Sequence, residues 1–130
     1  MIKYHKHIIY SPYRLRGERK ESIVMGKIRH PGEDLFYEAV LSLKSVEDCK
    51  LFFEDISTIK ELQSLFQRVR VACLLDSGSN YIEVSEMTGA RSATISRGNR
   101  GLNYGGGYRT ALDNLKEAGK LSDDGCDPEE

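Results

Sequence analysis

The sequence predicts an all-α fold, and two observations support this prediction. From Pro31 onward every strong apolar pattern has the three- and four-residue spacing of a helix. Between these patterns stand helix-start signals such as Thr58–Glu61 and glycine breaks such as Gly105–Gly107. The chain has 130 residues, of which 39% are hydrophobic and 30% charged, so it fits one soluble domain or one subunit of a small obligate dimer. No apolar run approaches the length of a membrane span.

The two ends of the chain differ from its middle. Residues 1–30 contain eight basic and two acidic residues without an apolar period, and we expect an irregular basic segment there. Either residues 1–24 are not part of the natural product, which would start at Met25, or they are an arm that adds DNA affinity by neutralising phosphates. Residues 121–130 carry five acidic residues and no basic one, which predicts a disordered acidic tail. The net charge of −1 averages over these patches and therefore neither favours nor excludes nucleic acid.

The helical domain is expected over residues 31–120. A first helix starts near Pro31, with Glu33 and Asp34 suiting its N-terminus. Its apolar positions are Leu35, Phe36, Ala39, Val40 and Leu43. A second helix starts at Ser45–Asp48, which resembles a capping box with Asp in place of Glu. Its apolar positions are Val46, Cys49, Phe52, Phe53 and Ile56.

The third helix is predicted to be the centre of the domain. It starts at the capping box Thr58–Glu61 and ends before Gly78. Its apolar residues are Leu62, Leu65, Phe66, Val69, Ala72, Cys73 and Leu75, and Val71 and Leu74 widen the stripe near its end. A helix that is apolar over so much of its circumference needs more than one neighbour to cover it.

Three shorter helices follow. The first spans about residues 81–88, a turn at Gly89–Arg91 leads into a second over about 92–103, and the last covers about 108–118 after the glycine break. The last helix is expected to turn Tyr108, Ala111, Leu112 and Leu115 inward.

Residues 81–97 have the pattern of a helix-turn-helix. Two helices that cross through a tight turn need a residue that tolerates positive φ, which Gly89 supplies. Val84 and Ile95 are the expected inward residues, and Ser85 is small enough for the crossing. Four arginines and no acidic residue lie between Arg91 and Arg109, which suits phosphate contact and guanine recognition. The residues predicted to contact DNA are Asn80, Arg91, Ser92, Ala93, Thr94, Ser96, Arg97 and Arg100. Either Asn80 or Ser79 is expected to cap the first helix of the motif.

Beyond these patterns, residues 31–117 resemble the YerC/YecD branch of the Trp repressor-like family. The motifs that carry the resemblance are Leu41–Lys44, Phe52–Asp55, Glu61–Leu65, Gln67–Arg68, Thr88–Ala90, Ala93–Arg97 and Leu102–Gly105. The resemblance implies an intertwined all-helical homodimer with one helix-turn-helix per subunit, and the partner chain would then cover the broad apolar surface of the third helix. It also implies a transcription regulator that binds double-stranded DNA.

The same resemblance implies a candidate effector pocket. Thr58, Arg68, Arg97 and Gly98 stand where Trp repressor has residues that contact its tryptophan. Two guanidinium groups there would hold a ligand carboxylate and the faces of a flat ring, and a side chain at Gly98 would crowd that ring. Gly101 replaces a serine that orients the ligand, and Ile82 and Ser85 replace basic residues, so neither tryptophan dependence nor the operator is inherited. The alternative is that Arg68 and Arg97 pair with carboxylates or phosphate.

The remaining patterns argue against other classes of protein. No GxxxxGK[ST], GxSxG or HExxH motif occurs, so we expect no enzyme, no cofactor beyond an amino-acid-like effector, and no metal. Three cysteines without a CxxC pair argue against a disulfide framework and fit a reducing cytoplasm, with Cys73 in the core. The alternative function is a helical adaptor that binds a transcription component without reading DNA itself.

Overall fold

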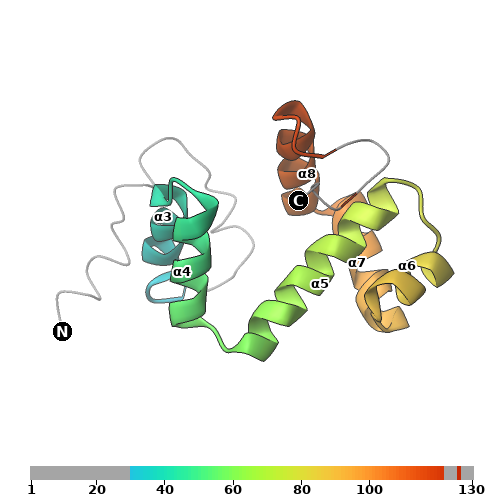
Figure 1. Ribbon diagram of the computed structural model, residues 1–130, viewed down its shortest axis with the longest axis horizontal. Helices are drawn as coiled ribbons and strands as arrows, with labels where there is room; N and C mark the ends of the chain where they lie inside the picture. Colours follow the sequence, from blue (N-terminus) through green and yellow to red (C-terminus); the bar gives the residue numbers. More distant parts are fainter. Residues whose placement is uncertain (1–29, 122–125, 127–130) are drawn as a thin grey trace. The chain divides into compact units, whose positions relative to one another are not determined.

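The computed structural model describes residues 30–121 and Cys126; the hypotheses about residues 1–24 and most of the acidic tail lie outside these described residues. The described part contains helices and no strand, which confirms the all-α class. Its helices are α3 (Glu33–Ser42), α4 (Val46–Ile56), α5 (Ile59–Asp76), α6 (Tyr81–Thr88), α7 (Ser92–Tyr104) and α8 (Gly107–Glu117), as labelled in Figure 1. None of these helices is long and apolar enough to cross a membrane. The described residues divide into two compact units, with the boundary between Asp55 and Ile56.

In the first unit, α3 and α4 are joined through aromatic side chains. The ring centroid of Phe36 lies 6.3 Å from that of Phe52 and 6.4 Å from that of Phe53. Ser45 accepts a hydrogen bond at 3.0 Å from the backbone N–H of Asp48, as the predicted cap requires. Several expected apolar positions of these helices are exposed, most of all Leu35 at 71% and Val46 at 67%.

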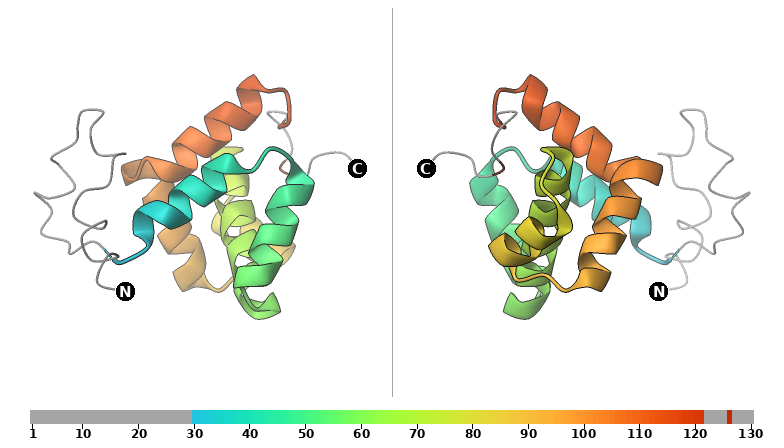
Figure 2. Two further views of the ribbon diagram at one scale, coloured as in Figure 1. Left: turned by 90° about the vertical axis from the view of Figure 1, so that its left-hand side faces the viewer. Right: turned by 90° about the vertical axis from the view of Figure 1, so that its right-hand side faces the viewer.

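The second unit is built on α5, and its start agrees with the prediction. The Thr58 hydroxyl accepts from the Glu61 backbone N–H at 3.2 Å, and the Glu61 carboxylate accepts from the Thr58 N–H at 3.4 Å. Helices α6, α7 and α8 gather around the C-terminal part of α5 (Figure 1). The two side views show that α8 follows α7 in the chain but runs in a different direction from it (Figure 2). The residues at the centre of this packing, Val71–Leu74, are buried.

Two clusters of buried side chains hold these helices. The first joins α5, α6 and α7 and consists of Val71, Leu74, Val84, Ala90 and Ile95. The second joins α5, α7 and α8 through Cys73, Leu102 and Leu112. The expectation that Ala111 faces inward is wrong, since it is exposed while the next residue, Leu112, is 2% exposed.

The part of α5 that precedes Val71 has a different surface. Leu65, Phe66 and Val69 are 41%, 65% and 52% exposed, so part of the broad apolar stripe predicted for this helix is uncovered in the single chain.

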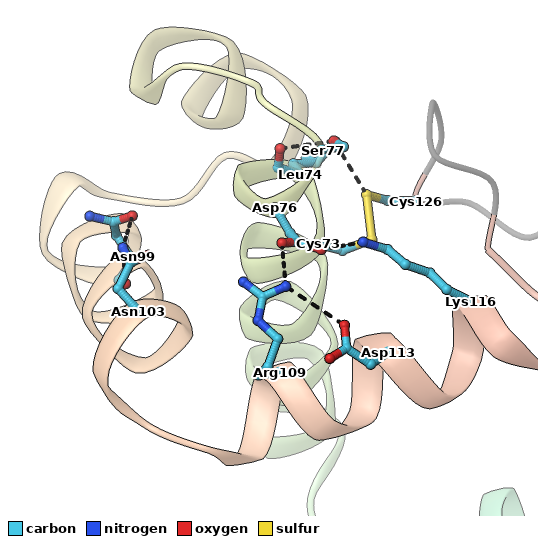
Figure 3. Close-up of polar contacts among 10 residues, drawn as sticks. All are labelled: Cys73, Leu74, Asp76, Ser77, Asn99, Asn103, Arg109, Asp113, Lys116 and Cys126. Carbon is cyan, nitrogen blue, oxygen red and sulfur yellow. Dashed lines mark hydrogen bonds and ion pairs between the residues drawn. A yellow bond between two sulfur atoms is a disulfide. The ribbon is translucent and has the colours of Figure 1, made fainter.

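A disulfide joins Cys73 of α5 to Cys126, which overturns the expectation that these cysteines stay unpaired (Figure 3). Cys126 packs against both buried clusters. The odd number of cysteines does not exclude a disulfide, because Cys49 is the one that stays free. The other two are 53 residues apart in the sequence and come together in the fold.

Asp76 at the end of α5 ties this helix to α8. Its carboxylate accepts hydrogen bonds at 2.7 Å from Lys116 and at 2.7 Å from Arg109, as Figure 3 shows. The hydrogen bond from Lys116, with a further contribution from Arg109, lowers the pKa of Asp76 below its ordinary value, although partial burial opposes this shift. The Asp76 carboxylate in turn raises the pKa of Arg109. These ion pairs fix the position of α8.

Candidate DNA-binding site and cavity

The helix-turn-helix begins with a complete cap on α6. The Asn80 side-chain oxygen accepts from the Glu83 N–H at 2.9 Å, and the Glu83 carboxylate accepts from the Asn80 N–H at 2.9 Å. Of the two predicted caps, Asn80 and Ser79, it is therefore Asn80 that caps this helix. The box also places the acidic Glu83 in the first turn, where it interacts favourably with the helix dipole.

The turn between α6 and α7 depends on Gly89. Its φ of 69° lies in the left-handed region, as the sequence predicts. Side chains from α6 fasten the turn: the Thr88 hydroxyl donates to the Val84 carbonyl at 2.6 Å and accepts from the Ala90 N–H at 3.1 Å. The Ser85 hydroxyl donates to the Ala90 carbonyl at 3.2 Å. The direction in which α7 leaves the turn is thus fixed by local hydrogen bonds.

Two side chains of α5 hold the other end of α6. Gln67 donates to the Thr88 carbonyl at 3.1 Å, and Arg70 donates to the Met87 carbonyl at 3.0 Å. They satisfy C-terminal carbonyls that have no partner within the helix. Sequence reasoning missed this role, although it singled out Gln67 as part of a family motif.

Helix α7 separates an inward face from an outward face. Ile95, Gly98 and Leu102 are buried. Among the residues predicted to contact DNA, Thr94 is half-buried and the others on and before α7 are exposed, namely Arg91, Ser92, Ala93, Ser96, Arg97 and Arg100. The fold therefore turns the predicted set away from the core.

The arginines of this region do not share one environment. Arg109 is bound to Asp76 and lies 3.7 Å from Asp113. Arg97 and Arg100 have no ion-pair partner among residues 30–121 and 126. The sequence predicted a cationic surface of four arginines, but Arg109 is paired with Asp76 and does not contribute a free charge to it. Helix α6 adds no cation, and its Ile82 is 71% exposed.

A cavity of about 130 Å³ lies beside α7. It is lined by Arg68, Ala93, Thr94, Arg97, Gly98 and Tyr108. The structure thus brings together three of the four predicted effector residues. Thr58 is not among the lining residues: it caps α5 ten residues before Arg68, a separation of about 15 Å along the helix. The sequence did not predict the other three lining residues for this pocket: it assigned Tyr108 to the core, and Ala93 and Thr94 to DNA contact.

Neither Arg68 nor Arg97 pairs with a carboxylate in the part of the chain that the structure describes. The predicted alternative, in which carboxylates of the chain occupy these guanidinium groups, has no support among the described side chains. Both remain available to an anion from outside.

These helices and their turn define a helix-turn-helix protein. A sequence profile of the Trp repressor protein family matches residues 32–116, and the chain belongs to that family. It is 48% identical over 92 residues to protein YerC of Bacillus subtilis strain 168, an alignment that covers 70% of this chain and 88% of YerC.

Two solved structures are similar to this chain. One is a candidate Trp repressor from Staphylococcus aureus, with a TM-score of 0.65, 35% identity, and coverage of 77% of this chain and 96% of that one. The other is a TrpR-like protein from Eubacterium eligens, with a TM-score of 0.65, 41% identity, and coverage of 75% and 98%. The family and these structures identify a Trp repressor-like fold and a helix-turn-helix regulator.

Proposed function

We propose that the protein is a homodimeric transcription regulator that binds double-stranded DNA and reads the major groove with α7. The observation that carries this proposal is the outward face of α7, where Arg97 and Arg100 are exposed and unpaired among the described residues, next to the short polar side chain of Ser96. Arginine binds phosphates and the O6 and N7 acceptors of guanine, and a short hydroxyl permits close approach to base edges. A DNA-binding regulator works where the chromosome is, so we place it in the cytoplasm.

A second copy of the chain completes this proposal. The exposed apolar side chains Leu65, Phe66 and Val69 on α5 support an interface that removes them from water. Two α7 helices related by a two-fold axis would meet successive major grooves about 34 Å apart. The expected operator therefore has two half-sites.

We further propose that a small effector with a carboxylate occupies the cavity. The guanidinium groups of Arg68 and Arg97 support this part of the proposal, because charge-assisted hydrogen bonds from arginine are the strongest that a carboxylate forms. Since Ala93, Thr94 and Arg97 belong to α7, an occupant of the cavity would contact the helix that reads DNA.

Retention on random-sequence duplex DNA at several salt concentrations tests DNA binding. Each phosphate that the protein neutralises adds about 0.9 to the slope of log affinity against log salt. Arg100→Gln should lower this slope by about one. Arg109→Gln is the matched control, because the Arg109 guanidinium already forms an ion pair with the Asp76 carboxylate. The salt dependence of DNA binding by this variant should equal that of the unmodified chain.

The competing function is a protein adaptor, and the outward face of α6 is the observation that favours it. This face carries Ile82 and Glu86 and no cation, which suits a protein partner better than a phosphate. An adaptor would show little salt-dependent retention on DNA. That result would overturn the proposal of DNA binding and favour the adaptor. With retention established, selection of genomic fragments by the purified protein, with and without an amino-acid mixture, identifies the operator.

A further inference from the structure

We propose that Tyr104, the last residue of α7, donates a hydrogen bond from its hydroxyl group to a DNA phosphate and so positions α7 in the major groove. The inference rests on the proposed function, because it adds a contact to the helix that reads DNA. The sequence patterns did not assign Tyr104 to DNA contact, although it lies in the Leu102–Gly105 motif.

Tyr104 is available to a partner outside the subunit. With 88% of its surface exposed, it is the most exposed large hydrophobic side chain in the described residues. The next three residues, Gly105–Gly107, have no side chains that could cover the ring. The Tyr104 hydroxyl has no hydrogen-bond partner among residues 30–121 and 126. An aromatic ring with a free polar group is typical of an interface residue.

Tyr104 lies on the same side of α7 as the residues predicted to contact DNA. The sequence places Ala93, Arg97, Arg100 and Tyr104 at four-, three- and four-residue spacing, which puts them on one face of a helix. All four are exposed, and the buried residues of α7 lie on the opposite side. The ring therefore extends the row of exposed side chains to the C-terminal end of α7.

The length of α7 indicates a phosphate and not a base as the partner of Tyr104. In a helix-turn-helix the N-terminal residues of the second helix contact the base edges. From Ser92 to Tyr104, α7 advances about 18 Å along its axis. The major groove is only about 12 Å wide, so a helix that enters it with its first turn has left the bases before it reaches Tyr104. Tyrosine is among the residues whose side chains donate to phosphate oxygens.

The neighbouring polar side chain is already engaged within α7. The Asn103 amide donates to the Asn99 carbonyl at 2.9 Å and to the Asn99 side-chain oxygen at 3.0 Å, as Figure 3 shows. At this end of α7 the hydroxyl of Tyr104 is therefore the donor that remains for DNA.

The composition of α6 gives such a contact a purpose. The first helix of a helix-turn-helix crosses the DNA backbone, but α6 carries Glu83 and Glu86 and no cation. Backbone contacts fix the orientation of a protein on the duplex. A neutral donor at the far end of α7 would supply one of the contacts that α6 is poorly suited to make.

Fluorescence anisotropy at several salt concentrations tests the contact, with random-sequence duplex DNA and with a fragment enriched in the genomic selection. Tyr104→Phe should weaken binding to both DNAs by about tenfold, the loss of one hydrogen bond to a charged acceptor. The factor should be equal for both, because a phosphate carries no sequence information. The salt dependence should not change, because the hydroxyl is neutral. Tyr37→Phe removes the hydroxyl of a tyrosine that is 58% exposed on α3, and should leave DNA binding unchanged.

Thermal unfolding and sedimentation check the fold and the oligomeric state of Tyr104→Phe and Tyr104→Ala. The inference is overturned if Tyr104→Phe binds both DNAs as tightly as the unmodified chain. It is also overturned if the variant loses affinity for the enriched fragment alone, which would indicate a base contact. Dissociation of the oligomer by Tyr104→Ala would overturn it too, because the ring would then belong to the subunit interface.

Arg100→Gln in the same experiment separates failure of this inference from failure of the proposed function. If Arg100→Gln lowers the salt slope by about one while Tyr104→Phe has no effect, the protein binds DNA without the Tyr104 contact. If the unmodified chain itself does not bind DNA, the proposed function fails and this inference fails with it.

Discussion

Gly98 of α7 lies directly against Val71 of α5. A Cβ atom added at Gly98 would stand 3.0 Å from Cγ1 of Val71, a side chain that is completely buried in the cluster behind the helix-turn-helix. The resemblance to the family assigned Gly98 to the effector pocket, where a side chain would crowd the ligand. The contact with Val71 gives the glycine a second reason, because it lets α7 approach α5 closely enough to bury Ile95.

Gly98→Ala should therefore lower the free energy of unfolding by about 1 kcal/mol. Overpacking a core costs about 1–3 kcal/mol, and the higher helix propensity of alanine offsets about 0.5–1 kcal/mol of that. Urea denaturation measures the change. If the contact with Val71 is the cause, the same substitution should cost less in a Val71→Ala background, and strictly additive effects would show that the clash lies elsewhere.

Ser96→Glu should weaken binding to duplex DNA by about a hundredfold, since like-charge juxtaposition in an interface costs several kcal/mol. Ser96 is exposed on α7 beside the two unpaired arginines, and its replacement leaves the apolar core untouched. Fluorescence anisotropy with labelled DNA measures the loss, and sedimentation checks that the oligomeric state is unchanged. Thr110→Glu, on the exposed surface of α8, adds the same charge and should have a much smaller effect. Unchanged binding by the Ser96 variant would mean that α7 does not read DNA.

Gln67→Ala should loosen α6 at a cost of about 1 kcal/mol, the usual net contribution of one hydrogen bond. The substitution removes the donor to the Thr88 carbonyl at the end of α6. Hydrogen exchange should accelerate in α6 and the turn at Gly89 more than in α8. Gln63→Ala, one turn earlier on the same helix, is the matched control, because Gln63 is exposed there. Equal effects of the two substitutions would show that Gln67 does not position α6.

Local signals in the sequence predicted the helix starts and the turn. The caps at Thr58 and Asn80 and the positive φ at Gly89 each depend on residues within three or four positions, so reading the chain in order was enough to find them. The outward set on α7 followed from helical periodicity in the same way.

The features that the sequence did not predict join residues far apart in the chain. Cys73 meets Cys126 across 53 residues, and Gln67 reaches the Thr88 carbonyl across 21. Tyr108 was predicted to be apolar core, and it does pack in the core, but only the crossing of α8 over Gly101 shows that the ring also bounds a cavity. Each of these depends on how the helices cross, which periodicity within one helix does not determine.

Cys126→Ser should lower the free energy of unfolding under oxidising conditions by about 4 kcal/mol, the chain-entropy value for a loop of this length. The disulfide closes the segment that contains the whole helix-turn-helix and α8. Denaturation of the oxidised protein measures the loss, and a reducing agent should bring the unmodified chain close to the variant. Cys49→Ser removes the free, half-buried cysteine and serves as the control. If the variant and the oxidised chain unfold at the same denaturant concentration, the two cysteines are not paired in solution.

Asp76→Asn should make the protein less sensitive to acid. The folded state lowers the pKa of Asp76 below its ordinary value of 3.8, above all through the hydrogen bond from Lys116. A lowered carboxyl pKa contributes stability that is fully present above the unfolded value and is lost as the pH falls through the folded value. The unmodified chain should therefore be more stable than Asp76→Asn near neutral pH, by about 1 kcal/mol for a partly exposed charged network, and this difference should shrink below about pH 4. Urea denaturation across this range measures it, with Asp113→Asn as a control that removes a more exposed carboxylate beside the same Arg109. A difference that stays constant into strong acid would show that the charge of Asp76 does not hold α8 in place.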